Sequence, residues 1–394
     1  MKLGQEFDPR CNALNAWRLA LATGVIVWHS FPLTGHEMDF APARHLLSAG
    51  FVDGFFAVSG FLITASWLNN PRPRAYFAAR ALRILPGLWA CLIVTAFVIA
   101  PIGVAIQGGS AAALLLSTEP FEYVIKNSAV AWVHPGIGDT PDGIPWPHMW
   151  DGSLWTLLWE VFCYVGVAIV GVTALRRRRW FVPAALALAL ICSALLPPLS
   201  RYDGVPPSEQ QGIDPTTGML ILAAIAARFA TMFLAGALLY QLRNVIPARW
   251  SLVAVSAGVV AASSVLANYR LVGAVALAYM IIASGALIHS ERLRLRTDVS
   301  YGVYIYAFPI QQVLVMYGLG RLVHPLIFAV VAAAITLPLA FASWFFVEKP
   351  ALQLKSRLKR ETTPISLKPR IDSSTSPPST AGNEGEIKRS EGQR

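Results

Sequence analysis

The chain has 394 residues, of which 55% are hydrophobic and only 14% are charged. A water-soluble domain carries about 25% charged residues, so this chain has too little polar surface for soluble domains, and its natural solvent is a lipid bilayer. The four cysteines are scattered and show no metal-like spacing, so we expect neither disulfides nor a structural metal. The net charge of +10 could indicate a nucleic-acid partner, which makes the positions of the basic residues decisive.

Apolar runs of about 20 residues, long enough to cross a bilayer as helices, recur along the whole chain. The first run is not followed by a small-residue cleavage site, so we interpret it as a retained helix and not as a signal peptide. We therefore predict an all-α, polytopic membrane protein with about ten transmembrane helices. They are expected near 13–33, 50–68, 82–104, 153–175, 180–199, 218–241, 250–267, 271–289, 300–319 and 324–346.

Basic residues gather in alternate connections between these runs. One set contains Arg72, Arg74, Arg80, the run from Arg176 to Arg179, Arg243, Arg249, Arg292, Arg294, Arg296, Lys349, Lys355, Arg357, Lys359 and Arg360. Lys and Arg in short loops are retained on the cytoplasmic side, so this pattern places both termini in the cytoplasm, as does an even number of helices. Topology explains the net positive charge without a nucleic-acid partner. Binding of a phosphate-bearing ligand on the inner face is a second use for these basic residues that the sequence leaves open.

The predicted organisation is a cytoplasmic N-terminus at 1–12, a membrane domain at 13–350 and a disordered, polar cytoplasmic tail at 351–394. Two long segments, 105–152 and 200–217, are expected outside the membrane. Loops over a rigid scaffold are where ligands commonly meet a protein, although the shorter segment could equally be a plain connection.

Apart from the first and last residue of each run, six Asp, Glu, His, Lys or Arg residues fall inside the apolar runs, where each costs about 2 to 3 kcal/mol and is by default functional or paired. They are Arg18, His29, Asp53, Arg83, Glu160 and Arg228. Helix geometry predicts that His29, Asp53 and Glu160 lie in one layer below the outer surface. It also places Arg18 on the same face as His29, about 16 Å further in.

A histidine beside carboxylates can act as a general base on a hydroxyl. The alternatives are that His29 is a structural histidine bonded to a carbonyl or a serine, and that Glu160 and Arg228 form a structural ion pair.

Inner arginines suit the phosphates of a cofactor. Arg18, Arg80 and Arg83 are candidates for this role, and topology is the competing explanation for Arg80 and Arg83. Ser59 and Gly60 are small residues that would suit close helix packing without any catalysis.

Four strings in this order resemble the acyltransferase 3 family, multi-spanning bacterial membrane enzymes that O-acylate extracytoplasmic glycans. The resemblance covers about residues 12 to 350. The strings are Arg18, ten residues and then His29; Phe-Phe-x-x-Ser-Gly ending at Gly60; Arg80-Ala-Leu-Arg83; and the segment from Ser153 through Trp155 and Glu160 to Tyr164.

The resemblance implies a cytoplasmic acyl-CoA donor, for which we expect acetyl-CoA, and a glycan or lipid-linked saccharide acceptor outside the inner membrane. It implies that His29 is catalytic, with Arg18 as its motif partner and Glu160 as the acidic motif residue. We expect Glu160 or Asp53 to orient the His29 ring, and Arg80 and Arg83 to bind donor phosphates.

The chain also departs from the family pattern. Leu14-Asn15-Ala16-Trp17-Arg18 replaces a frequent Leu-Asp-Gly-Leu-Arg, and Ala307 stands in the region where many members carry a second histidine. We expect no appended esterase-like domain, so the membrane part would act alone or with separate polysaccharide-assembly proteins.

The prediction is an O-acyltransferase of an exported polysaccharide. Its rivals are a transporter or flippase of a lipid-linked glycan and a non-catalytic assembly subunit.

Overall fold

The computed structural model describes residues 1–354, apart from 10, 132, 174, 176, 177, 202–213 and 296. Most of the predicted outer segment 200–217 and nearly all of the predicted disordered tail lie outside the described residues. The described part is helical and contains only isolated β-bridges in place of strands. For the residues that the structure describes, the prediction of an all-helical fold is confirmed.

A helix occupies each of the ten predicted positions. The helices are α2 (Leu14–Leu33), α3 (Ala41–Asn69), α4 (Pro73–Val94) continued by a π-turn (Thr95–Ile99) into α5 (Ala100–Ile106), α8 (Trp155–Val172), α9 (Phe181–Leu195), α10 (Pro215–Gln241), α11 (Trp250–Ser263), α12 (Arg270–Leu287), α13 (Ser300–Met316), and α15 (Pro325–Ser343) continued by a π-turn (Trp344–Glu348). Six of the described segments are long and apolar enough to cross a membrane: α3, α4 with α5, α8, α10, α12, and α15 with its extension. The ten-span count and the cytoplasmic termini stay predictions.

The clearest difference from the sequence-based boundaries is at α3, which begins at Ala41 and not near residue 50. The first turns of α3 carry Arg44, His45 and Ser48. Hydropathy marks where a helix enters the hydrocarbon, and a helix continues into the polar region as long as its backbone hydrogen bonds are satisfied. The segment 105–152 also contains two short helices, α6 (Ala111–Leu116) and α7 (Glu119–Asn127). Two further short helices are α1 (Leu3–Glu6) and α14 (Leu319–Leu322).

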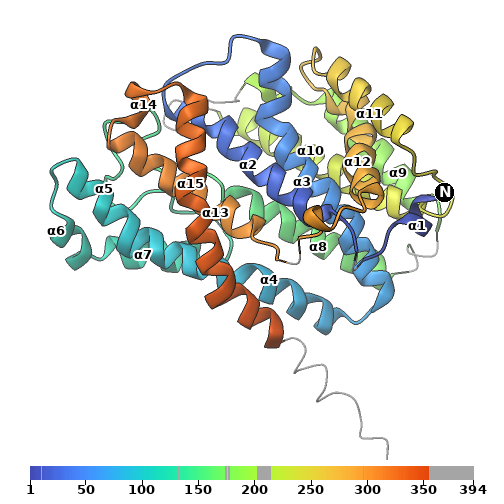
Figure 1. Cartoon of the computed structure of the whole chain (residues 1–394), viewed down its shortest axis with the longest axis horizontal. Helices are drawn as coiled ribbons and strands as arrows, with labels where there is room; N and C mark the ends of the chain where they lie inside the picture. The colour runs from blue at the N-terminus through green and yellow to red at the C-terminus, as the bar shows by residue number, and fades with distance from the viewer. Residues whose placement is uncertain are drawn as a thin grey trace, which may run out of the picture.

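Helix α3 lies in the middle of the bundle and contacts α10 along much of its length, with α2 and α8 also against it. Helix α13 packs between α2 and α15. In Figure 1, α5, α6 and α7 lie at one end of the molecule and α9, α11 and α12 at the other, with α2, α3 and α13 between them. Helices α2, α3 and α8 carry most of the predicted site residues.

Candidate functional site

A cavity lies between α2, α3, α8 and α13. Its polar lining comes from Arg18, Ser59, Thr156, Glu160, Ser300, Tyr301 and Tyr304. Three residues predicted from the sequence, Arg18, Ser59 and Glu160, therefore meet at one cavity. Val52, Phe55, Phe56 and Leu157 line the remainder, so the cavity combines apolar walls with a few polar groups, as is usual for ligand sites.

Arg18 and Arg83 share one carboxylate at the edge of this cavity. Oδ2 of Asp298 accepts hydrogen bonds from Nη1 of Arg18 and, at 2.6 Å, from Nη2 of Arg83. Nη1 of Arg83 lies 3.2 Å from Oε2 of Glu348, and the Ser300 hydroxyl donates to Oδ1 of Asp298 at 2.5 Å. Burial by itself raises the pKa of Asp298, but the two guanidinium groups lower it below its usual value. This carboxylate is therefore ionised at neutral pH.

Arg80 stands apart from this cluster. Its guanidinium lies over the Tyr164 ring, 5.8 Å from the ring centroid, and its Nε is buried with no hydrogen-bond partner. Among the described residues no acidic side chain forms an ion pair with Arg80. Among the described residues, Arg80 is therefore the predicted phosphate-binding arginine that forms no ion pair with an acidic side chain.

Glu160 accepts two hydrogen bonds on a single oxygen. Its Oε1 receives the hydroxyl of Ser59 at 3.2 Å and the hydroxyl of Tyr164, one turn further along α8. The predicted alternative of a Glu160–Arg228 ion pair is wrong, because Arg228 is bound elsewhere. Glu160 faces the cavity together with Arg18 and not with His29.

Asp53 is the centre of a buried ion-pair cluster. Its carboxylate accepts from Nε of Arg228 at 2.8 Å, from Nε of Arg270 at 2.5 Å and from the Tyr269 hydroxyl at 2.5 Å. The three charged side chains are 8% exposed or less. These contacts join α3 to α10 and α12, so the structure gives Asp53 and Arg228 a structural position.

His29 lies near the other end of α2 from Arg18. Its ring meets the edge of Phe308 on α13, with centroids 5.1 Å apart and planes at 84°, and its Nδ1 is buried without a hydrogen-bond partner. Neither Glu160 nor Asp53 is hydrogen-bonded to His29, so the expected carboxylate that orients the ring is not there. Sequence position gives the depth of a residue along a helix, but the rotation of the helix about its axis decides which neighbouring helix the side chain faces. The rotation of α3 turns Asp53 toward α10 and α12.

Two other motif residues, Gly60 and Trp155, pack against α10. A Cβ atom on Gly60 would lie 1.9 Å from the carbonyl oxygen of Phe233, and one on Gly236 would lie 1.9 Å from that of Ala57. The backbones of α3 and α10 therefore touch at these two glycines. Trp155 packs against Phe229, with ring centroids 5.5 Å apart.

Sequence reasoning missed three acid–base partners for one shared reason. Arg270, Asp298 and Glu348 lie one or two residues beyond the ends of predicted apolar runs, and only residues inside the runs were considered. Helix ends are where polar side chains reach back toward buried partners. A search extended by one helical turn at each end would have found them.

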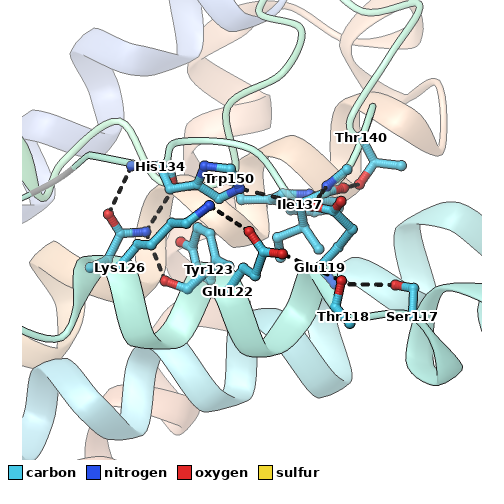
Figure 2. Close-up of polar contacts among 12 residues, drawn as sticks. Ser117, Thr118, Glu119, Glu122, Tyr123, Lys126, His134, Ile137, Thr140 and Trp150 are labelled. Carbon is cyan, nitrogen blue, oxygen red and sulfur yellow. Dashed lines mark hydrogen bonds and ion pairs between the residues drawn. The ribbon is translucent and has the colours of Figure 1, made fainter.

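Described residues of the segment 105–152 make polar contacts with one another, some of which are drawn in Figure 2. Nζ of Lys126 lies 2.5 Å from Oε2 of Glu122 on α7, and Nε2 of His134 lies 3.9 Å from Oε2 of Glu119. The Trp150 indole donates to the Thr140 hydroxyl at 3.1 Å. Contacts of His134 and Gly138 with Glu119 and Asn127 hold the later part of the segment against α7. Within the described residues no group of three His, Cys, Asp or Glu side chains could hold a metal ion.

Comparison with known proteins decides the family. A family model described as the acyltransferase domain matches residues 12–345 of this chain. The chain belongs to the acyltransferase 3 family. This acyltransferase is 28% identical to a Shigella phage Sf6 protein named O-acetyl transferase, over 88% of this chain and 98% of the relative. It is 25% identical to nodulation protein 10 of Rhizobium leguminosarum bv. viciae, over 79% of this chain and 84% of that protein. No solved structure gives a significant match.

Family membership confirms the resemblance noted in the sequence and identifies the chain as a transferase enzyme. Six long apolar helices together with the family identify the acyltransferase as a membrane protein. The roles of its individual residues stay predictions.

Proposed function

We propose that this acyltransferase moves an acyl group, in particular acetyl, from cytoplasmic acyl-CoA to a hydroxyl of an extracytoplasmic polysaccharide at a bacterial inner membrane. The observation that carries the proposal is the pair of polar centres on α2. Arg18 lines a cavity at one end, beside Arg83 and Asp298, and His29 lies near the other end. Eleven residues of helix separate them by about 16 Å, a span that suits a donor and an acceptor approaching from opposite sides.

The arginine cluster supports the donor half of the proposal. Arg18, Arg83, Asp298 and Glu348 come from four different segments, each of which lies next to a connection that the positive-inside rule assigns to the cytoplasm. The fold brings all four together, as a common membrane side requires. Guanidinium groups suit phosphates because they offer several N–H donors in a planar fork. Arg80, which lies apart from the cluster, adds a further guanidinium that forms no ion pair with an acid among the described residues.

In the proposed reaction His29 acts as the general base. The neutral imidazole takes the proton of a sugar hydroxyl while the hydroxyl oxygen attacks the thioester carbonyl. The carbon–sulfur bond then breaks, the imidazolium returns the proton to sulfur, and CoA leaves as the thiol. Because Nδ1 is buried, the acceptor would meet the other ring nitrogen. The perpendicular contact with the Phe308 ring would orient the imidazole in place of a carboxylate. An acyl-histidine intermediate is the alternative route.

The test is transfer of label from acetyl-CoA into polysaccharide by membranes that contain the protein. The wild-type chain should label polysaccharide, and His29→Ala should lower the rate by at least about a hundredfold, the contribution of a general base. His36→Ala, an exposed histidine just after the end of the same helix, is the matched control and should keep wild-type activity. Activity of His29→Ala within twofold of wild type, at equal protein level, would exclude a catalytic role for His29.

A further inference from the structure

Asp298 lies at the inner end of the cavity, and the donor-binding proposal gives it no role beyond its place in the arginine cluster. It lies in the connection between α12 and α13, outside the apolar runs, and its side chain is 13% exposed. One of its oxygens is shared by arginines from two different helices, α2 and α4. The other oxygen is held by the hydroxyl of Ser300 at the start of α13. The carboxylate is thus fixed from three sides.

Two guanidinium groups repel each other unless an anion lies between them. Asp298 supplies this anion and sets the distance between Arg18 and Arg83. Each guanidinium has five N–H donors. The contacts with acidic side chains occupy one nitrogen of Arg18 and two of Arg83, so donors remain on both. The Arg18 side chain is 23% exposed and lines the cavity, so a ligand can reach it.

We propose that Asp298 is a positioning residue for the acyl donor, which holds Arg18 and Arg83 side by side so that their remaining N–H groups bind the donor's phosphates. This inference rests on the proposed function, because it assumes that the donor carries phosphates. Asp298 touches neither the thioester nor the acceptor. Its removal should therefore weaken donor binding and leave the chemical step unchanged.

The opposite role is also testable. If Asp298 instead occupied the phosphate site and had to be displaced, its loss would tighten donor binding. The sign of the change in donor affinity separates a residue that assembles the site from one that blocks it.

The experiment compares wild type with Asp298→Asn, Asp298→Glu and the control Glu291→Gln, an exposed acid in the same connection. Purified protein in detergent is titrated with CoA, and transfer is measured with acetyl-CoA and with acetylpantetheine, which lacks the nucleotide phosphates. Asp298→Asn should raise the Kd for CoA and the KM for acetyl-CoA about tenfold or more, the value of one charge-assisted contact. It should leave kcat and the KM for acetylpantetheine unchanged. Asp298→Glu should recover part of the affinity, and Glu291→Gln should match wild type.

Several outcomes overturn the inference. These are an unchanged or lower Kd for CoA in Asp298→Asn, equal losses with both donors, or failure of the wild-type protein to bind CoA. Wild-type CoA binding without acyl transfer would count against the proposed function alone, since the Kd values still test Asp298. If Asp298→Asn does not accumulate, Ser300→Ala removes only the bond to Oδ1. Ser300→Ala should raise the Kd for CoA severalfold, and an unchanged Kd would overturn the inference.

Discussion

Replacing Asp53 with Asn should lower the stability of the acyltransferase, and its effect on transfer should come from this loss of stability and not from a catalytic role. The substitution keeps the size of the side chain but removes the charge that Arg228 and Arg270 share. Removing one partner of a buried ion pair costs about 3 to 5 kcal/mol, because the other charge is left without compensation. Here one carboxylate serves two arginines that are 8% and 7% exposed, so we expect the upper part of this range. Such a loss is a large share of the usual 5 to 15 kcal/mol of total stability.

The assay is thermal unfolding in detergent, with transfer activity measured on the protein that remains folded. Asp53→Asn should unfold at a clearly lower temperature and accumulate poorly. Adding Arg228→Gln removes one of the two positive charges left in the cluster, so the double variant should be more stable than the sum of the single losses predicts, by about 0.5 to 3 kcal/mol. A wild-type unfolding temperature for Asp53→Asn together with lost activity would refute this reasoning and return Asp53 to the catalytic group.

Three further predictions follow from single contacts. Gly60→Ala places a Cβ against a backbone carbonyl and should destabilise the protein by about 1 to 3 kcal/mol or more in thermal unfolding, whereas Gly166→Ala, with open space around it, should be neutral; equal effects would contradict the α3–α10 contact. Burial raises the pKa of Asp151 well above its usual value, so ionisation of this carboxyl opposes folding; the unfolding temperature should fall as the pH rises from about 4 toward the raised pKa, Asp151→Asn should lessen this fall, and an unchanged pH dependence would contradict the shift. Arg80→Gln should raise the KM for acyl-CoA without lowering the unfolding temperature, whereas Arg83→Gln, which leaves Glu348 without its arginine and Asp298 with Arg18 alone, should lower both stability and donor affinity; a stable Arg83→Gln would argue against the ion-pair cluster.

The positions of the helices could be predicted from the sequence because an apolar run of sufficient length has few alternatives to a helix in a bilayer. Their ends could not, and α3 shows why. Its first turns carry polar residues that hydropathy assigns to a loop but that a helix accommodates outside the hydrocarbon. The folded segment around α7 was also beyond prediction in detail, because its contacts depend on loop side chains such as His134 and Trp150.

The site was predicted in part. Arg18, Ser59 and Glu160 meet at the cavity, so the unusual polar residues of the first four runs do mark a common place. The partner of each could not be predicted, because helix rotation in the bundle is set by packing across all neighbours, such as the glycine contact between α3 and α10. That rotation separates Asp53 from His29 and gives it to Arg228 and Arg270.

The central claim is that the donor enters from the cytoplasmic side and the acceptor is modified on the other. The most direct test uses sealed membrane vesicles of both orientations, supplied with labelled acetyl-CoA, which does not cross a lipid bilayer because of its charge. Inverted vesicles, which expose the cytoplasmic face, should transfer label to polysaccharide enclosed inside them, and His29→Ala should abolish this transfer. Sealed right-side-out vesicles should transfer none until they are permeabilised. Equal labelling in both orientations, or none in inverted vesicles that contain acceptor, would contradict the account.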